Sequence, residues 1–340
     1  MSKSPLFPPD PSRRAIPVGL FVLTLCILVV AAAIRPVSLS GGAPRVVVIP
    51  SGAPSSAIGQ ILRDAGIIRS ASDFVLTVRI RGLSHSLQGG EYRLSPAMSL
   101  LAVVDVVARG QVLLHAVTIP EGLTAAEVVD VLVDKELGDR EQLTTVVRHG
   151  ADLYTFSFLD GAVGGSLEGF LLPDTYQIPR GLPARDIVGV FLGRFSRVVL
   201  PLWEERGGGR SLREIITMAS LVEREARLPE ERALIAGVLF NRLHRRMLLE
   251  VDATVLYALG RHKSVVTYKD LEVNSPYNTY RHIGLPPGPI ANPGVAAIEA
   301  ALTPAVTDYL YYVARADGSH VFSRTYQEHL AAVRRQRSLP

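Results

Sequence analysis

The chain has 340 residues, of which 48% are hydrophobic and 20% are charged, and its formal net charge is +4. This composition excludes an intrinsically disordered chain, which is poor in apolar residues and rich in charge. It is slightly too apolar for a purely soluble protein, which indicates one localised hydrophobic segment. The basic residues are scattered along the chain and form no clustered patch, so no nucleic-acid partner is expected.

The first expected element is a membrane anchor at residues 15–34, which carry no charge. At about 1.5 Å per residue, a helix of that length spans a hydrocarbon core of about 30 Å. Lys3, Arg13 and Arg14 precede it, so the positive-inside rule predicts a cytoplasmic tail at 1–14 and an extracytoplasmic body. We therefore expect a single-pass protein of the inner (plasma) membrane.

A cleaved signal peptide is the alternative interpretation of the same segment. Residues 31–33 are three alanines, which a signal peptidase would accept as a cleavage site. The apolar run is long for a signal peptide, which favours a retained anchor. The only cysteine, Cys26, lies inside the run, so the body can form no disulfide and no cysteine-based zinc site.

Residues 35–44 are expected to form a polar linker, followed by a small module at 45–120. β-Branched and helical patterns alternate in this module. The expected strands are 45–48, 91–94 and 112–119, and the expected helices are 55–65 and 99–109.

Residues 121–210 are expected to form a connecting region that is mostly helical, with a loop at 161–179 and a glycine-rich break at 206–210. Beyond the break, residues 211–340 are expected to form a second domain. Its expected elements are helices 211–227 and 230–246, a hairpin of strands 309–314 and 320–323, and a closing helix at 325–337. The fold class is therefore α+β.

Two carboxylates on the helix expected at 211–227 are the first chemical candidates. Glu223 lies within an apolar stripe, and Glu225 lies about 200° around the helix on a face that is also apolar. A carboxyl group among apolar groups has a raised pKa and can stay protonated to act as a general acid. The alternative is ordinary ion pairing with Arg227, Arg232 or Arg242.

The segment 274–294 is the second candidate, because Tyr277, Asn278 and Tyr280 offer stacking faces and hydrogen-bonding groups suited to a sugar. The alternative is a structural loop stiffened by its prolines. Asp252 is a weaker candidate that could equally be a helix N-cap. The eight histidines show no metal-ligand spacing, so no metal and no cofactor are expected.

Several motifs together resemble the endolytic murein transglycosylase family of the YceG-like type, over about residues 45–335. They include GEYRL (90–94), EGFLLPDTY (168–176), ASLVEREA (219–226), MLLEVDATVLY (247–257), SPYNTY (275–280), GLPPGPIANPG (284–294) and GSHVFSRTYQEH (318–329). The resemblance implies a LysM-like module at 45–120 and a mainly helical, lysozyme-like catalytic domain at 211–340 that includes the hairpin.

The resemblance also implies residue roles. In the family the second glutamate of the E-x-E pair is catalytic, which is Glu225 here, and Glu223 is kept as the structural or supporting carboxylate. The helical pattern alone does not choose between the two. Tyr277-Asn278 resembles the AYN segment of other lytic transglycosylases, although Pro276 stands in place of the alanine. Asn278, Tyr277, Tyr280, Glu223 and Asp252 are thus the candidate substrate-binding residues.

The expected activity is cleavage of the MurNAc–GlcNAc bond inside nascent peptidoglycan strands, which leaves 1,6-anhydro-MurNAc ends. The implied partners are glycan strands and peptidoglycan synthases. Most glycoside hydrolases need two carboxylates, whereas the implied lyase needs only Glu225. A muramidase that uses Asp252 or Glu223 as a second carboxylate remains an alternative. A non-catalytic peptidoglycan-binding scaffold is the other.

Overall fold

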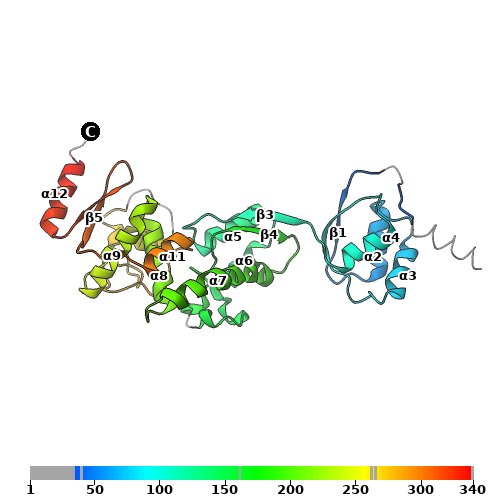
Figure 1. Ribbon diagram of the computed structural model, residues 1–340, viewed down its shortest axis with the longest axis horizontal. Coiled ribbons are helices and arrows are strands. Elements are labelled where there is room, and N and C mark those ends of the chain that lie inside the picture. Colours follow the sequence, from blue (N-terminus) through cyan, green and yellow to red (C-terminus); the bar gives the residue numbers. More distant parts are fainter. Residues whose placement is uncertain (1–34, 39–40, 161, 261–262, 264–265, 338–340) are drawn as a thin grey trace, which may run out of the picture. The chain divides into compact units, whose positions relative to one another are not determined.

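The computed structural model describes residues 35–38, 41–160, 162–260, 263 and 266–337. The chain divides into two compact units, with the boundary between Leu113 and Leu114 (Figure 1). The anchor predicted at 15–34 and the tail before it lie outside the described residues. Within the described ranges, no helix combines the length and the apolar character needed to cross a membrane.

The described residues of the first unit form two antiparallel strands and three helices. In chain order these are β1 (Arg45–Ile49), α2 (Ser55–Asp64), α3 (Ala71–Ile80), β2 (Gly90–Leu94) and α4 (Leu100–Ala108). β1 pairs with β2 so that Val47 faces Tyr92, and both side chains enter a core that also holds Phe74. The sequence did not predict α3, whose β-branched residues blur the helical pattern, although Ser70 caps it.

The second unit opens with a strand that the sequence assigned to the preceding module. β3 (Leu114–Thr118) pairs antiparallel with β4 (Thr175–Pro179), which lies at the end of the segment expected to be a loop. This long-range pairing is why the first unit ends at Leu113, before the predicted module end at residue 120. The mixed helices and strands confirm the α+β class.

Helices make up most of the second unit, which ends in a β-hairpin and a last helix. The elements after β3 are α5 (Ala125–Asp134), α6 (Arg140–His149), α7 (Ala184–Arg206), α8 (Leu212–Glu225), α9 (Arg232–His244), α10 (Asp252–Leu259), α11 (Val295–Leu302), β5 (Tyr311–Ala314), β6 (His320–Ser323) and α12 (Tyr326–Arg337). Short 3-10 turns lie at Ala151–Leu153, Ser157–Leu159, Val163–Gly165, Pro229–Glu231 and Asp270–Glu272.

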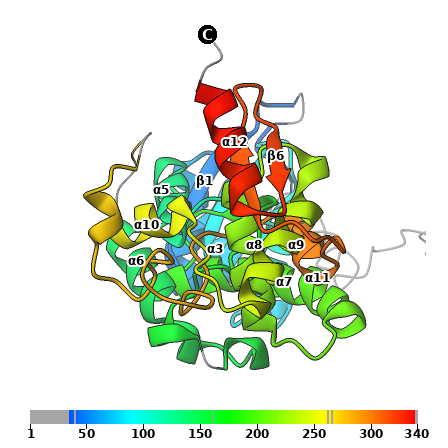
Figure 2. The ribbon, with the colours of Figure 1, turned by 90° about the vertical axis from the view of Figure 1, so that its left-hand side faces the viewer.

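Helix α8 is the central element of this unit. Ser211 and Glu214 form a capping box at its start, and residues 215–222 are all buried. Figures 1 and 2 both place α8, α9 and α11 side by side. The prediction that α8 is packed on both sides is therefore confirmed. One hydrophobic core runs from Val117 to Leu302, so residues 121–210 and 211–340 share a core across the predicted boundary.

Candidate active site

Glu225 is the last residue of α8. The helix ends there because Ala226 leaves the helical conformation, with φ −75° and ψ 118°, and Pro229 follows three residues later. The helix thus ends two residues before the predicted end at 227. This early end places the Glu225 side chain, which is half-buried, beside the C-terminal hairpin.

The surroundings of Glu225 favour its protonated form. The pKa of its carboxyl group is raised to about 7, chiefly by burial and also by the nearby Asp252 carboxylate, while a hydrogen bond from Tyr312 opposes the rise. The Tyr312 hydroxyl donates to Oε2 of Glu225 over 3.0 Å. The negative end of the α8 dipole also disfavours a charged carboxylate at this position. A carboxyl group with a pKa near 7 can deliver a proton at neutral pH and take one back.

Asp252 and Tyr280 complete this group of side chains. Asp252 is the first residue of α10, where Val251 occupies the N-cap position, so the structure does not place Asp252 as the cap. The Tyr280 hydroxyl donates to Oδ1 of Asp252 over 2.5 Å, and burial together with Asp252 and Glu225 raises the pKa of Tyr280. Glu225, Asp252, Tyr280 and Tyr312 thus come together from four segments of the chain.

Asn278 is buried, with no exposed area. Its amide nitrogen donates to the carbonyl oxygens of Leu271 and Val273, over 2.8 and 2.9 Å, and its Oδ1 accepts from the backbone N–H of Tyr280 over 3.0 Å. The side chain therefore shapes the loop that presents Tyr280, and its predicted positioning of substrate is indirect at most.

Tyr277 lies on another side of the same loop. Its ring centroid is 5.0 Å from that of Tyr257 on α10, and burial and the nearby Glu168 raise its pKa. Tyr277 is therefore associated with Glu168 rather than with Glu225, although the sequence grouped it with Tyr280.

Glu223 contacts the backbone of a neighbouring helix. Its Oε2 accepts from the backbone N–H of Gly294, at the start of α11, over 3.1 Å, which ties α8 to α11. Burial and the neighbouring Glu121 raise its pKa. These contacts fit the supporting role expected for Glu223 and give it no direct part in the group around Glu225.

Two of the three arginines of the ion-pairing alternative have other carboxylate partners. Arg232 approaches Glu121, with 3.8 Å between nitrogen and oxygen, and Arg242 pairs with Glu250 over 2.9 Å. The raised pKa of Glu225 is therefore the consequence of burial that the helical pattern predicted.

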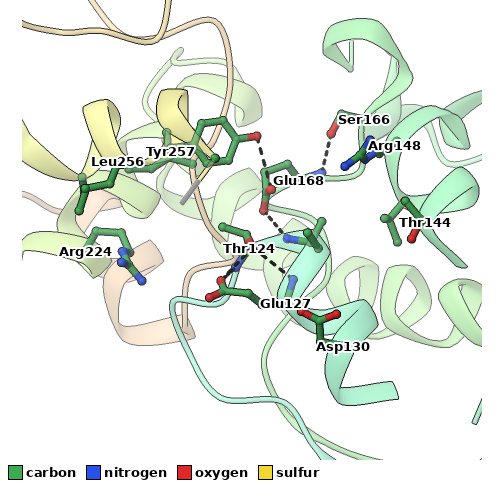
Figure 3. A pocket seen from close by; sticks show the side chains of 16 residues that line it. Thr124, Glu127, Asp130, Thr144, Arg148, Ser166, Glu168, Arg224, Leu256 and Tyr257 are labelled. Carbon is green, nitrogen blue, oxygen red and sulfur yellow. Dashed lines mark hydrogen bonds between the residues drawn. The ribbon is translucent and has the colours of Figure 1, made fainter. Parts of the chain in front are cut away.

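Glu168 is a residue whose importance the sequence reasoning missed, although it opens the EGFLLPDTY motif. Only 7% of it is exposed, and burial raises its pKa to about 8. Its Oε1 accepts from the backbone N–H of Ala125 over 2.9 Å and from the Asn292 side chain over 3.3 Å. The Tyr257 hydroxyl lies 3.4 Å from Oε2 (Figure 3). A single acid inside an apolar run was the signal that could have identified it.

Gly169 allows Glu168 to reach this position. Its φ is +86°, and a Cβ there would lie 2.5 Å from Cγ of Pro289. Asn292 then accepts from the backbone N–H groups of Gly169 and Leu171, over 3.0 and 2.9 Å. The proline-rich segment 284–294 is thus packed against the Glu168 loop, as the structural alternative for that segment expected.

Among the residues that the structure describes, no three His, Cys, Asp or Glu side chains gather as a metal site requires.

Comparison with known proteins places these features in a family. The model of the YceG-like family matches residues 47–335. The endolytic murein transglycosylase of Bacillus subtilis (strain 168) is 36% identical over 294 residues, which cover 83% of this chain and 81% of that protein. The endolytic murein transglycosylase of Streptococcus pneumoniae serotype 2 is 28% identical over 308 residues, and the match covers 82% of this chain but only 56% of that protein.

A solved structure gives the same result. The crystal structure of a putative yceG-like protein from Listeria monocytogenes is 36% identical, with a TM-score of 0.59, and the match covers 85% of this chain and 99% of that one. The resemblance inferred from the motifs is confirmed, and the chain belongs to the YceG-like family.

Proposed function

We propose that this protein is an endolytic peptidoglycan lytic transglycosylase whose general acid is Glu225. The observation that carries the proposal is the half-buried carboxyl group at the end of α8, with a pKa raised to about 7 and a hydrogen bond from Tyr312. The relatives from Bacillus subtilis and Streptococcus pneumoniae, both named endolytic murein transglycosylases, support the activity.

The proposed reaction uses one carboxyl group twice. Protonated Glu225 donates its proton to the oxygen that links MurNAc to GlcNAc, and the bond from that oxygen to MurNAc C1 breaks as oxocarbenium character develops. The Glu225 carboxylate then removes the proton from the MurNAc C6 hydroxyl. The C6 oxygen bonds to C1, which closes a 1,6-anhydro ring and returns the proton to Glu225.

Asp252 and Tyr280 have a supporting role in this reaction. The negative charge of Asp252 lies near enough to raise the pKa of Glu225, and the same charge stabilises a developing oxocarbenium ion. Tyr280, held by Asp252, offers a ring and a hydroxyl group to the sugar. Holding the substrate in a reactive geometry favours attack by its own C6 hydroxyl over attack by water.

The remaining expectations complete the proposal. Residues 15–34 anchor the protein in the plasma membrane, with residues 1–14 in the cytoplasm and the body outside. The first unit, with its own core, acts as a LysM-like module that holds the glycan strand. Cleavage close to the membrane would end strand elongation beside the peptidoglycan synthases, which are the proposed protein partners.

Digestion of uncrosslinked nascent glycan tests this proposal. The full chain in detergent is compared with Glu225→Gln, which keeps the shape of the side chain and removes its titration, and with Glu230→Gln as a control at an exposed position. We expect 1,6-anhydro ends by mass spectrometry from the wild type and the control, and none from Glu225→Gln. Reducing ends would identify a muramidase instead, and intact strands with all three proteins would favour the scaffold.

A further inference from the structure

A cavity of about 440 Å³ opens in the second unit, in addition to the group around Glu225. Its walls come from the start of α5, from α6, from the loop at 166–168, from the end of α8 and from one face of α10. Figure 3 shows Glu168 and Tyr257 pointing toward each other here, with Thr144 and Arg148 across from them. A concave site of this size, with a few polar groups that converge, is typical of a ligand pocket.

The cavity adjoins the proposed active site through two chain neighbours. Arg224 and Ala253 line it, and they directly precede Glu225 and directly follow Asp252. Along α10, the rise from Asp252 to Tyr257 is about 7.5 Å. A ligand in the cavity would therefore lie within reach of a sugar placed at Glu225.

The polar groups deep in the cavity suit an uncharged partner. Oε1 of Glu168 accepts from two N–H groups, of Ala125 and Asn292. Oε2 accepts from the Tyr257 hydroxyl over 3.4 Å, a long bond that the hydroxyl can exchange for one to a ligand oxygen. Burial raises the pKa of the Glu168 carboxyl group to about 8, which favours its neutral form at pH 7, and the two N–H groups on Oε1 leave Oε2 as the oxygen that can hold the proton. Glu168 and Tyr257 can then each donate to a hydroxyl or acetamido oxygen.

The charged groups of the wall balance one another. Two arginines, Arg148 and Arg224, and two acids, Glu127 and Asp130, line the cavity. Glu127 also serves the capping box of α5 together with Thr124. A site for an anionic stem peptide would require an excess of positive charge, so a neutral saccharide fits this wall better. Leu256 and the Tyr257 ring supply an apolar surface for its ring face.

We propose that this cavity is a saccharide subsite, in which Glu168 and Tyr257 donate hydrogen bonds to an uncharged N-acetylated sugar of the strand that Glu225 cleaves. The proposal rests on the proposed function, because it takes the ligand from the same glycan. Binding energy gained in the cavity would fix the position of the scissile bond beside Glu225.

Binding of peptide-free glycan oligomers, measured by calorimetry, tests the subsite apart from cleavage. The Glu225→Gln chain, full length and in detergent, is the common background, so the ligand stays intact. Adding Tyr257→Phe removes one donor and keeps the ring, and we expect affinity to fall roughly threefold to tenfold. Tyr268→Phe, at a position that is 87% exposed, is the matched control and should change nothing.

A second variant makes the test independent of any local disturbance around Tyr257. Ala126 lines the cavity and is exposed, so Ala126→Phe places a ring in the cavity without disturbing the core. We expect this variant to weaken glycan binding by about tenfold or more, because the ring competes for the space that the sugar would occupy.

The outcomes separate the two proposals. Affinities unchanged in both cavity variants, while the wild type still produces anhydro ends, would overturn the subsite and leave the proposed function standing. Absence of cleavage by the wild type would overturn the proposed function, whatever the binding data show. Cavity variants that weaken binding only of peptide-bearing strands would assign the cavity to the stem peptide and also overturn the saccharide subsite.

Discussion

Replacing Glu168 by glutamine should remove a large pH dependence from the stability of the second unit. Moving the pKa of a carboxyl group from its ordinary 4.5 to about 8 corresponds to about 5 kcal/mol, at about 1.4 kcal/mol per pH unit. Because the folded-state pKa lies above the unfolded one, the stabilisation is complete below about pH 4.5 and is lost as the pH rises through about 8. Glutamine keeps an acceptor toward Ala125 and Asn292 and does not ionise.

The charged and titratable groups that face Glu168 from neighbouring elements stay in place in the variant. Glu127 on α5 and Tyr257 on α10 are the main ones. Burial raises the pKa of Tyr257 above its ordinary value, and its interaction with Glu168 raises it further, so Tyr257 stays protonated over the pH range of the test in both proteins. The difference in unfolding free energy therefore reports the titration of Glu168 together with its interaction with Glu127.

Urea unfolding followed by tryptophan fluorescence measures this difference. Trp203 is the only tryptophan of the chain and lies in α7 of the second unit, so its emission reports on the unit that contains Glu168. We expect the two proteins to differ by a constant below pH 4.5. Between pH 5 and 9 the wild type should lose on the order of 4 kcal/mol relative to Glu168→Gln. Parallel stability curves over this range would refute a neutral, buried Glu168.

Three further substitutions test the geometry around the two carboxyl groups. Gly169→Ala should destabilise the second unit by roughly 3 kcal/mol in the same urea assay, because the new Cβ would contact Pro289 and φ of residue 169 is +86°. A loss of stability below about 0.5 kcal/mol would contradict this. Tyr312→Phe removes the hydrogen bond that lowers the Glu225 pKa, so the alkaline limb of the pH–kcat/KM profile should move to higher pH. An unchanged limb would show that Tyr312 does not influence the pKa of Glu225. Asn278→Ala leaves two loop carbonyl groups without their donor and should cost about 2 kcal/mol. Hydrogen exchange should then show faster exchange at the Tyr280 amide, and a raised KM with unchanged exchange would assign Asn278 to the substrate instead.

The sequence predicted correctly those features that depend on the spacing of apolar residues within one helix. The apolar faces of α8 indicated a helix buried on both sides, and burial of Glu225 follows from that position. The choice of Glu225 over Glu223 needed the family motif. What distinguishes them is a long-range contact, with Tyr312 for one and Gly294 for the other.

Long-range pairing explains what the sequence could not predict. The pairing of β3 with β4 joins residues about sixty positions apart. Because of it, β3 belongs to the second unit and the boundary between the units lies before the predicted position. The side-chain amide of Asn278 is of a type that often binds sugars, yet its hydrogen bonds are made to the backbone of its own loop. Side-chain type indicates what a residue can bind, whereas enclosure by other segments decides what it does bind.

Glu168 illustrates how a stability penalty can indicate function. The hydrogen bonds that its Oε1 accepts from Ala125 and Asn292 could equally be accepted by a glutamine, which would not ionise at neutral pH. A glutamine would therefore join α5 to the 284–294 segment without the loss of stability that the raised pKa implies. What the carboxyl group adds at the Oε2 position, where a glutamine would carry an NH2 group that only donates, is an oxygen that accepts from the Tyr257 hydroxyl and, when protonated, can also donate into the cavity. Groups held at such a disadvantage concentrate at functional sites, and this is the physical reason to look for the sugar beside Glu168 as well as at Glu225.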